Sequence, residues 1–258
     1  MTPSETYLEN CAGIIETVRA QKAEIERTAD IFAETILAGR MVHLFGSGHS
    51  RIMVEEMWPR YGSFTGFNPI VELSLTFHNG VVGANGQRQA MFLENVSGLA
   101  PRILRNFDLK PADSALIISS SGTNIVPVEI GAEFQRRGVK NVVALVSKVH
   151  SDASESKTED GKKLTDYAEI ILDTGAPVGD ASVEIEGVEG KVAPLSTIGG
   201  AMIVNAIKAE VAQRLAAAGQ PPTVLTAANQ VGAERAIEMF ESAYDEHSRR
   251  LSKLYAGL

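Results

Sequence analysis

The sequence contains one cysteine, Cys11, among its 258 residues. A single cysteine excludes a disulfide within the chain and a zinc site built from several thiolates. Low cysteine usage is typical of a reducing compartment, so we expect a cytoplasmic protein. The segment MTPSETYLENCAGIIETVRAQ also lacks the basic start and apolar centre of a secretory signal peptide.

Positive charge is scarce as well. The chain has 24 Lys and Arg against 32 Asp and Glu, which gives a formal net charge of −8. A surface for nucleic acid needs clustered Lys and Arg, so we expect no nucleic-acid partner. No apolar run approaches the length of a membrane span, which excludes a membrane helix. Hydrophobic residues make up 44% of the chain, and the length fits one domain over residues 1–258.

Short apolar runs alternate with helical patterns in the middle of the chain. Continuous apolar runs are typical of strands that are buried on both faces, as in parallel sheets. The alternation predicts an α/β fold, a doubly wound three-layer αβα sheet with right-handed crossovers. The expected strands are 41–45, 115–119, 142–146 and 170–172, with a weaker one at 67–71, and the expected helices are 51–61, 89–106 (bent or broken at Pro101) and 125–137.

Longer helices are expected on either side of this core, which covers about residues 40–195. Near-helical spacing of apolar residues predicts one helix over 6–37, ended by Gly39. This helix has more apolar surface than a monomer needs to cover, so we expect a homodimer or homotetramer formed through it. Further helices are expected within 197–255, at 197–218 and 229–255, and loops are expected at 147–164 and at 173–194, the latter with a short strand in SVEIEG.

The first expected strand runs into a glycine turn, GSGHS at residues 46–50. Backbone N–H groups in such a turn, at the carboxyl end of a parallel strand, can face an anion. The spacing matches neither G-x-G-x-x-G nor a P-loop, because no third glycine and no G-K-[ST] follows. Tight packing without a ligand is the alternative. The residues expected to border a ligand are Gly46, Ser47, Gly48 and Ser50, with His49 beside them.

A denser group of donors follows the strand expected at 115–119. The segment LIISSSGTNIVPVE places small and hydroxylated residues at a helix start, where Pro127 is tolerated in the first turn. A helix N-cap needs only one hydroxyl, and this segment supplies several. We therefore predict a phosphate site formed by Ser119, Ser120, Ser121, Gly122, Thr123 and Asn124.

LIISSSGTN resembles the phosphosugar-binding sequence S-x-S-G-x-[ST] of the SIS (sugar isomerase) domain family. Ser119, Ser121 and Gly122 match it, whereas Asn124 stands where the family often has Ser or Thr. FGSGHS matches the first glycine turn of the same fold, and GAPVGDA and LTFHNG resemble one phosphosugar-binding branch. The resemblance covers about residues 42–172. It implies a five-stranded parallel sheet in flavodoxin-like order, a sugar phosphate as ligand, and dimers or tetramers that share active sites.

An isomerase of a sugar phosphate needs a base, a group that opens the ring and donors for an enediolate. EEMWPRYG resembles the helix of phosphoheptose isomerases in which the second Glu is functional, so Glu56 is the candidate base. A solvated helix face is the alternative. The candidate histidines are His49 in the glycine turn, His78 in LTFHNG and His247 on the last helix, since SIS isomerases often recruit a late histidine.

The remaining histidines are expected elsewhere: His43 in the core and His150 solvated in a loop. We expect no cofactor and no metal, because Ile52 occupies the position where some phosphoheptose isomerases have a zinc-binding His. Three functions stay open. They are an aldose–ketose isomerase acting through an enediolate, a lyase or etherase on an amino-sugar phosphate, and a non-catalytic sugar-phosphate binding or sensor protein. Because residues 1–40 are expected to form one helix, a helix-turn-helix regulator is disfavoured.

Overall fold

A five-stranded parallel sheet forms the centre of the computed structural model, which describes residues 1–76 and 87–257. The strand order is β2-β1-β3-β4-β5, the flavodoxin-like order that the resemblance implied. The strands are β1 (Val42–Gly46), β2 (Phe67–Ile70), β3 (Ser114–Ile118), β4 (Asn141–Val146) and β5 (Ile170–Asp173). The order reverses between β1 and β3, where connections leave toward opposite edges. Such a switch point opens a crevice beyond the carboxyl ends of the strands.

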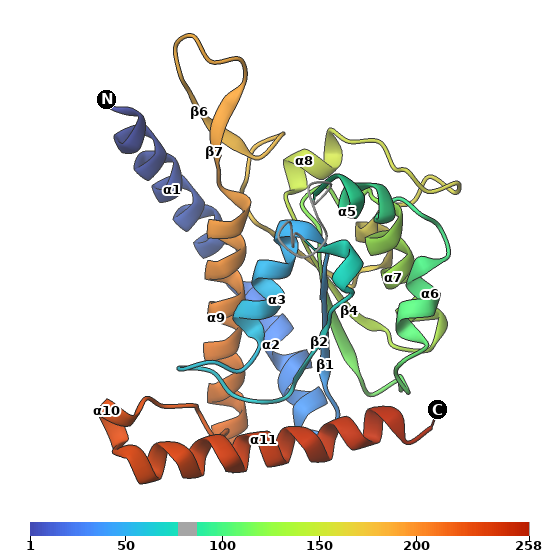
Figure 1. Cartoon of the computed structure of the whole chain (residues 1–258), viewed down its shortest axis with the longest axis vertical. Helices are drawn as coiled ribbons and strands as arrows, with labels where there is room; N and C mark the ends of the chain where they lie inside the picture. Colours follow the sequence, from blue (N-terminus) through green and yellow to red (C-terminus); the bar gives the residue numbers. More distant parts are fainter. Residues whose placement is uncertain (77–86, 258) are drawn as a thin grey trace.

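Helices cover both faces of this sheet (Figure 1). Those before the last third of the chain are α1 (Pro3–Ala20), α2 (Lys22–Leu37), α3 (Arg51–Met57), α5 (Gln87–Leu93), α6 (Leu99–Leu104), α7 (Ile125–Arg136) and α8 (Lys148–Asp152). The later ones are α9 (Ser196–Ala217), α10 (Ala228–Val231) and α11 (Ala233–Tyr255). Single turns of 3-10 helix occur at Gly48–Ser50, Leu73–Leu75 and Leu164–Tyr167.

Alternating strand residues build two separate cores, as a three-layer fold requires. Leu44, Leu116 and Leu145 pack with side chains of α2, α3 and α9 on one face. Phe45 and Ile117, one residue further along their strands, pack with α6 and α7 on the other face. The sheet is therefore buried on both sides, which explains why its strands are continuously apolar.

The N-terminal helical region is broken, contrary to the single helix expected over 6–37. α1 ends before Gln21, and α2 begins after it. The Gln21 amide binds the backbone at the end of β5: Nε2 donates to the carbonyl of Asp173 at 2.8 Å, and Oε1 accepts from its N–H at 2.6 Å. These two hydrogen bonds attach Gln21 to the end of β5. The chain changes direction there, so that α2 packs against the sheet and α1 extends away from it.

The helix expected over 89–106 is also two helices, and the break does not lie at Pro101. α5 ends at Leu93 and α6 begins at Leu99, after Gly98 with φ of +84°. Pro101 falls in the first turn of α6, where its missing N–H leaves no hydrogen bond unmade. The end of α5 is important for the site, because the N–H of Glu94 closes the last turn onto Ala90 while its carbonyl accepts from the N–H of Val126 at 2.9 Å, which ties α5 to the start of α7.

Two further boundaries differ from expectation. α3 ends at Met57 rather than residue 61, because Trp58 precedes Pro59 and takes an extended conformation. The helix expected over 229–255 is interrupted at Gly232, whose φ is +84°. The expected strand in SVEIEG is present as β6 (Ala181–Glu184), which pairs with β7 (Lys191–Pro194) in a hairpin beside α1 (Figure 1).

α11 crosses the end of the molecule opposite to the carboxyl ends of the strands (Figure 1). Arg250 Nη1 donates to the carbonyls of Ile36 and Arg40, and His247 packs edge-on against Trp58. These contacts hold α11 on the lower face of the core. Within the part of the chain that the structure describes, no helix is both long and apolar enough to cross a bilayer.

Candidate functional site

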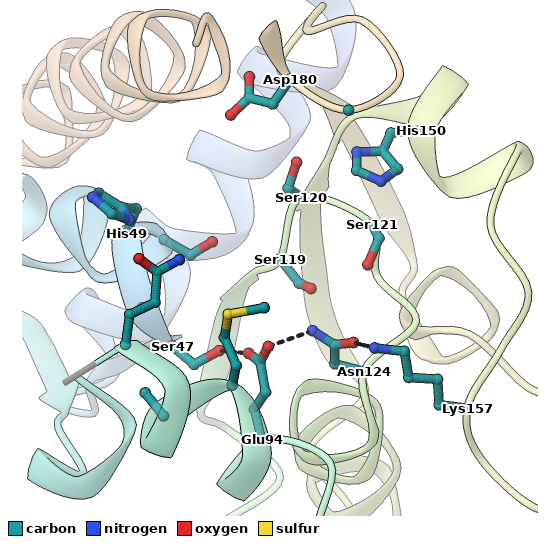
Figure 2. A pocket seen from close by; sticks show the side chains of 16 residues that line it. Ser47, His49, Glu94, Ser119, Ser120, Ser121, Asn124, His150, Lys157 and Asp180 are labelled. Atoms are coloured by element: carbon teal, nitrogen blue, oxygen red, sulfur yellow. Dashed lines mark hydrogen bonds between the residues drawn. The ribbon is translucent and has the colours of Figure 1, made fainter. Parts of the chain in front are cut away.

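A pocket of about 490 Å³ lies beyond the carboxyl ends of the strands, at the switch point between β1 and β3 (Figure 2). It is bordered by the loop after β1, the end of α5, the loop after β3, α8 and the segments around Lys157 and Asp180. The predicted glycine turn and the predicted phosphate loop therefore face the same space. Of the predicted residues, the pocket is lined by Ser47, Gly48, His49, Ser50, Ser119, Ser120, Ser121 and Asn124.

The glycine turn is tightly closed. A Cβ at Gly46 would lie 2.7 Å from the carbonyl oxygen of Ser50, so any larger residue would force the turn open. The turn directs the Ser47 hydroxyl inward, where its Oγ donates to Glu94 Oε2 at 2.8 Å. His49 and Ser50 form the adjoining wall of the pocket. The turn thus holds the Glu94 carboxylate through Ser47, and it also lines one side of the pocket.

The phosphate loop between β3 and α7 is held by its own hydroxyls. Ser119 Oγ accepts from the N–H of Gly122 at 3.2 Å, and Ser121 Oγ lies 2.8 Å from Thr123 Oγ1. Gly122 has φ of +65°, a left-handed conformation that favours glycine. The loop gathers several hydroxyls at the start of α7, while the N–H groups of Gly122 and Thr123 donate to Ser119 and Ser121 Oγ within it. Such a neutral donor group at a helix N-terminus suits an anion.

Glu94 is the main site residue that sequence reasoning missed. Its half-buried carboxylate receives hydrogen bonds from Ser47 and from Asn124, whose Nδ2 donates to Oε1 at 2.7 Å. Burial raises the pKa of Glu94 above its ordinary value, although Ser47, the charge of Lys157 and Asn124 act in the opposite direction. No local sequence motif marks Glu94, because its neighbours Met91 and Phe92 are exposed and its hydrogen-bond partners come from other segments.

Lys157 and His150 also line the pocket, although the segment 147–164 was expected to be a loop with a solvated histidine. α8 forms there, with Ser147 as N-cap, and the Nδ1 atom of His150 is buried without a hydrogen-bond partner in the described structure. The Lys157 N–H donates to the carbonyl of Thr123 at 3.1 Å, and its Nζ donates to Asn124 Oδ1. Backbone pairing with the phosphate loop therefore brings these side chains to the site.

Glu56 lies away from the residues that border the pocket. Its Oε1 accepts from Asn205 Nδ2 at 3.0 Å, and its Oε2 accepts from Arg60 at 2.7 Å. Burial alone would raise the pKa of Glu56, but these hydrogen bonds and the charge of Lys208 lower it. This environment holds Glu56 as an ionised partner on the α3–α9 contact, outside the lining of the pocket.

The other two predicted residues have different positions. His247 is buried against Trp58, with ring centroids 4.6 Å apart, at the opposite end of the molecule from the pocket. His78 lies outside the described residues. His43 is buried in β1, as expected. Among the residues described, no group of three His, Cys, Asp or Glu side chains is arranged to hold a metal ion.

Comparison with known proteins gives consistent results. Residues 6–147 match the family model described as "SIS domain". A UPF0309 protein of Brucella abortus (strain S19) is 33% identical over 230 residues, which cover 89% of this chain and 90% of that protein. A UPF0309 protein of Halalkalibacterium halodurans is 33% identical over 219 residues, 85% of this chain and 88% of that protein.

A likeness to solved structures is also found. A phosphoheptose isomerase from Francisella tularensis superposes with a TM-score of 0.51 at 17% sequence identity. The match covers 81% of this chain and 96% of that chain. At 17% identity the similarity concerns the fold alone.

Proposed function

Because this chain belongs to the SIS domain family, we propose that its pocket binds a sugar phosphate and isomerises it between aldose and ketose forms. The observation that carries the proposal is the position of Glu94. Its carboxylate is held between the glycine turn and the phosphate loop by Ser47 and Asn124. A base at this point faces the space that the body of a bound sugar phosphate would occupy.

The phosphate group is assigned to the loop after β3. Ser119 and Ser121 line the pocket there and provide hydroxyls, at the start of α7. Lys157 is the one lysine or arginine among the described residues that line the pocket, and it lies next to this loop. A single cation beside neutral donors supports binding of a phosphate ester at this loop.

Glu94 is assigned the proton transfer. In its ionised form it takes the proton from the carbon next to the sugar carbonyl, which leaves an enediolate, and it delivers a proton to the former carbonyl carbon. The hydroxyl proton passes from one enediolate oxygen to the other, so that the carbonyl and the hydroxyl exchange places. A raised pKa makes the carboxylate a better base near neutral pH. His49 and Ser50 line the same pocket, and they are candidates to donate hydrogen bonds to the developing oxyanion.

The test compares two carboxylates of this chain. Wild type, Glu94→Gln and Glu56→Gln are incubated in D₂O with pentose, hexose, heptose and amino-sugar phosphates, and deuterium incorporation and product formation are followed by NMR. We expect exchange and isomer formation with at least one sugar phosphate. We expect Glu94→Gln to reduce both by about 10²-fold or more, which is the contribution typical of general acid–base catalysis. Glu56→Gln should remain within a few fold of wild type.

The same experiment separates the alternatives. Release of a substituent from the sugar, instead of isomer formation, would assign a lyase or etherase. Saturable binding without exchange or product would assign a sugar-phosphate binding protein. Equal loss in Glu56→Gln and Glu94→Gln would contradict the choice of Glu94. Binding itself is checked with Ser121→Ala, which should weaken the affinity for every phosphate ester.

We also propose that α1 mediates a homodimer or homotetramer. Leu8 is 67% exposed on this helix, and Ile15 is also exposed, although both are large and apolar. Burial of such side chains against another copy would be favourable. Light scattering after size-exclusion chromatography should give a mass above that of one chain, and Leu8→Glu with Ile15→Glu should reduce it. A monomeric wild-type protein would contradict this assignment.

A further inference from the structure

Asn124 is the N-cap residue of α7, yet its side chain makes no capping hydrogen bond to the first turn of this helix, all of whose residues the structure describes. An N-cap side chain ordinarily accepts from the N–H of the second or third helical residue. The third residue is Pro127, which has no N–H, and the N–H of the second, Val126, donates to the carbonyl of Glu94 at 2.9 Å. The amide of Asn124 is therefore not used to cap the helix.

Both ends of this amide instead bind charged side chains. Nδ2 of Asn124 donates to Glu94 Oε1 at 2.7 Å, and Oδ1 accepts from Lys157 Nζ. Lysine can only donate and an ionised carboxylate can only accept, so the two partners fix which end of the amide faces which residue. Asn124 thus lies between the lysine of the pocket and the proposed base (Figure 2).

Glu94 is attached to the start of α7 at two points. Its backbone carbonyl accepts from Val126, and its carboxylate accepts from Asn124. On the other side, Ser47 Oγ donates to Oε2 at 2.8 Å. A carboxylate has about four lone-pair positions, so two remain for a substrate. The position of the base therefore depends on the segment that directly follows the phosphate loop.

Lys157 is held at the same loop, since its N–H donates to the carbonyl of Thr123 at 3.1 Å. Burial raises the pKa of Glu94, and the hydrogen bond from Ser47, the charge of Lys157 and the hydrogen bond from Asn124 partly offset this effect. Hydrogen bonds in a row polarise one another, so Lys157 strengthens the bond from Asn124 to Glu94. With the loop empty, this row keeps the carboxylate a weaker base.

A phosphate group in the loop would change this row. Its oxygens only accept hydrogen bonds and carry negative charge, so they compete with Asn124 Oδ1 for the ammonium group of Lys157. Asn124 then donates less strongly to Glu94, and the positive charge near the base is compensated. The carboxylate becomes a stronger base when the loop is filled.

We propose that Asn124 is a positioning residue that makes proton transfer by Glu94 depend on an occupied phosphate loop. This inference rests on the proposed function, because it concerns the same base and the same phosphate site. The phosphate of the substrate then raises kcat as well as affinity, which is an effective use of binding energy from a part of the substrate that does not react. A free sugar is a poor substrate until a separate oxyanion fills the loop.

Deuterium exchange in D₂O tests this dependence. The full-length protein is incubated with the free sugar that corresponds to a sugar phosphate it turns over, with and without inorganic phosphite. Phosphite has the three terminal oxygens of a phosphate ester and no sugar. We expect saturating phosphite to accelerate exchange into the free sugar about threefold or more, since the rate of general-base catalysis rises with the basicity of the carboxylate.

Variants of Asn124 identify the route of this effect. Asn124→Ser introduces a hydroxyl too short to span Lys157 and Glu94. We expect it to retain phosphite affinity within about threefold in calorimetry, to lose the acceleration, and to lower kcat for the sugar phosphate about tenfold or more with little change in KM. Asn124→Asp keeps the size of the side chain but lacks the Nδ2 donor, and it replaces Asn124→Ser if that variant does not fold.

Asn95→Ser is the matched control. Asn95 directly follows Glu94, but its Nδ2 donates to the carbonyl of Met91 at 2.8 Å, and its side chain does not line the pocket. Phosphite should accelerate exchange in this variant as in wild type. Melting temperatures of all variants verify folding.

Four outcomes would overturn the inference. Equal exchange by wild type with and without phosphite would show that the loop does not control the base. Acceleration that persists in the folded Asn124 variants would assign the effect to another route. Weakened phosphite binding in Asn124→Ser with unchanged acceleration at saturation would make Asn124 a phosphate ligand. An equal fall of both exchange rates with a lower melting temperature would make its role structural.

Failure of the proposed function gives a different result. If no sugar phosphate undergoes exchange or isomerisation, the proposed function itself fails. Turnover of a sugar phosphate without any effect of phosphite on the free sugar rejects only the dependence on the loop.

Discussion

Glu94 and Asn124 lie thirty residues apart in the sequence, and Asn124 Nδ2 donates to Glu94 Oε1 at 2.7 Å. Ser47 binds the other carboxylate oxygen, and Lys157 binds the Asn124 carbonyl oxygen. These side chains form one hydrogen-bonded row across the pocket (Figure 2). The row connects the proposed base to the proposed phosphate site, and this connection has measurable consequences.

Replacement of Lys157 should shift the pH dependence of turnover. Burial raises the pKa of Glu94, and the positive charge of Lys157 partly offsets this effect. In Lys157→Met the pKa of Glu94 therefore rises further, and the acid limb of the kcat/KM profile should move to higher pH. Lys162→Met is the matched control, because Lys162 lies over the ring of Tyr167 on the same segment. An unchanged acid limb in Lys157→Met would contradict the electrostatic connection.

Glu94→Gln and Glu56→Gln should change stability in opposite directions. The pKa of Glu94 is raised in the folded state, so its ionisation destabilises the fold as pH rises past its ordinary value of 4.5. The pKa of Glu56 is lowered, so its ionisation stabilises the fold above the same pH. At pH 7, Glu94→Gln should keep or raise the melting temperature, whereas Glu56→Gln should lower it. The Glu94 difference should vanish as pH falls below the ordinary pKa of 4.5, whereas the Glu56 difference should be lost as pH falls through the lowered pKa of Glu56 in the folded state.

Gly122→Ala should impair the phosphate loop. The φ of +65° at Gly122 costs an L-residue roughly 1–2 kcal/mol, and the added Cβ would lie 3.2 Å from Val146 Cγ1. We expect a reduced melting temperature and weaker binding of inorganic phosphate in calorimetry. Gly187→Ala is the control, because Gly187 has a similar φ of +78° with open space around it, far from the loop. If phosphate binding weakened in Gly187→Ala and not in Gly122→Ala, the assignment of phosphate to the loop at Gly122 would be rejected.

Asp113→Asn should destabilise the end of the sheet opposite the pocket. The carboxylate of Asp113 is fully buried, and it accepts two hydrogen bonds of 2.7 Å from Arg40. Burial alone would raise its pKa, but His43 and Arg40 lower it to about 2. We attribute this mainly to Arg40, since His43 Nε2 lies 3.6 Å away.

Loss of one partner from such a buried pair costs about 3 kcal/mol, which urea denaturation at pH 7 would measure. Because the folded-state pKa is depressed, the stabilisation by Asp113 is complete above its ordinary pKa of 3.8 and is lost as pH falls toward 2. The difference between wild type and Asp113→Asn should therefore narrow over that range. A difference that stays constant down to pH 2 would contradict the low pKa.

Much of the fold was predictable from local sequence patterns. The continuous apolar runs that became β1, β3, β4 and β5 are typical of strands buried on both faces, and their positions were correct to within one or two residues. Helix boundaries were less predictable, because the break at Gln21 depends on hydrogen bonds to Asp173, which lies 152 residues away. Such a partner leaves no local pattern.

The sequence by itself determined the two loops of the site, because their glycines and hydroxyls are contiguous and set the local backbone geometry. Only the tertiary structure brought Glu94, His150 and Lys157 to the same pocket, since Glu94 follows α5, the other two lie in the segment after β4, and none belongs to a contiguous motif. In the structure, Glu56 accepts a hydrogen bond from Asn205 on α9, and His247 packs against Trp58. Neither side chain lines the pocket. Residue type and spacing indicate which groups have suitable chemistry, but long-range packing decides which of them meet.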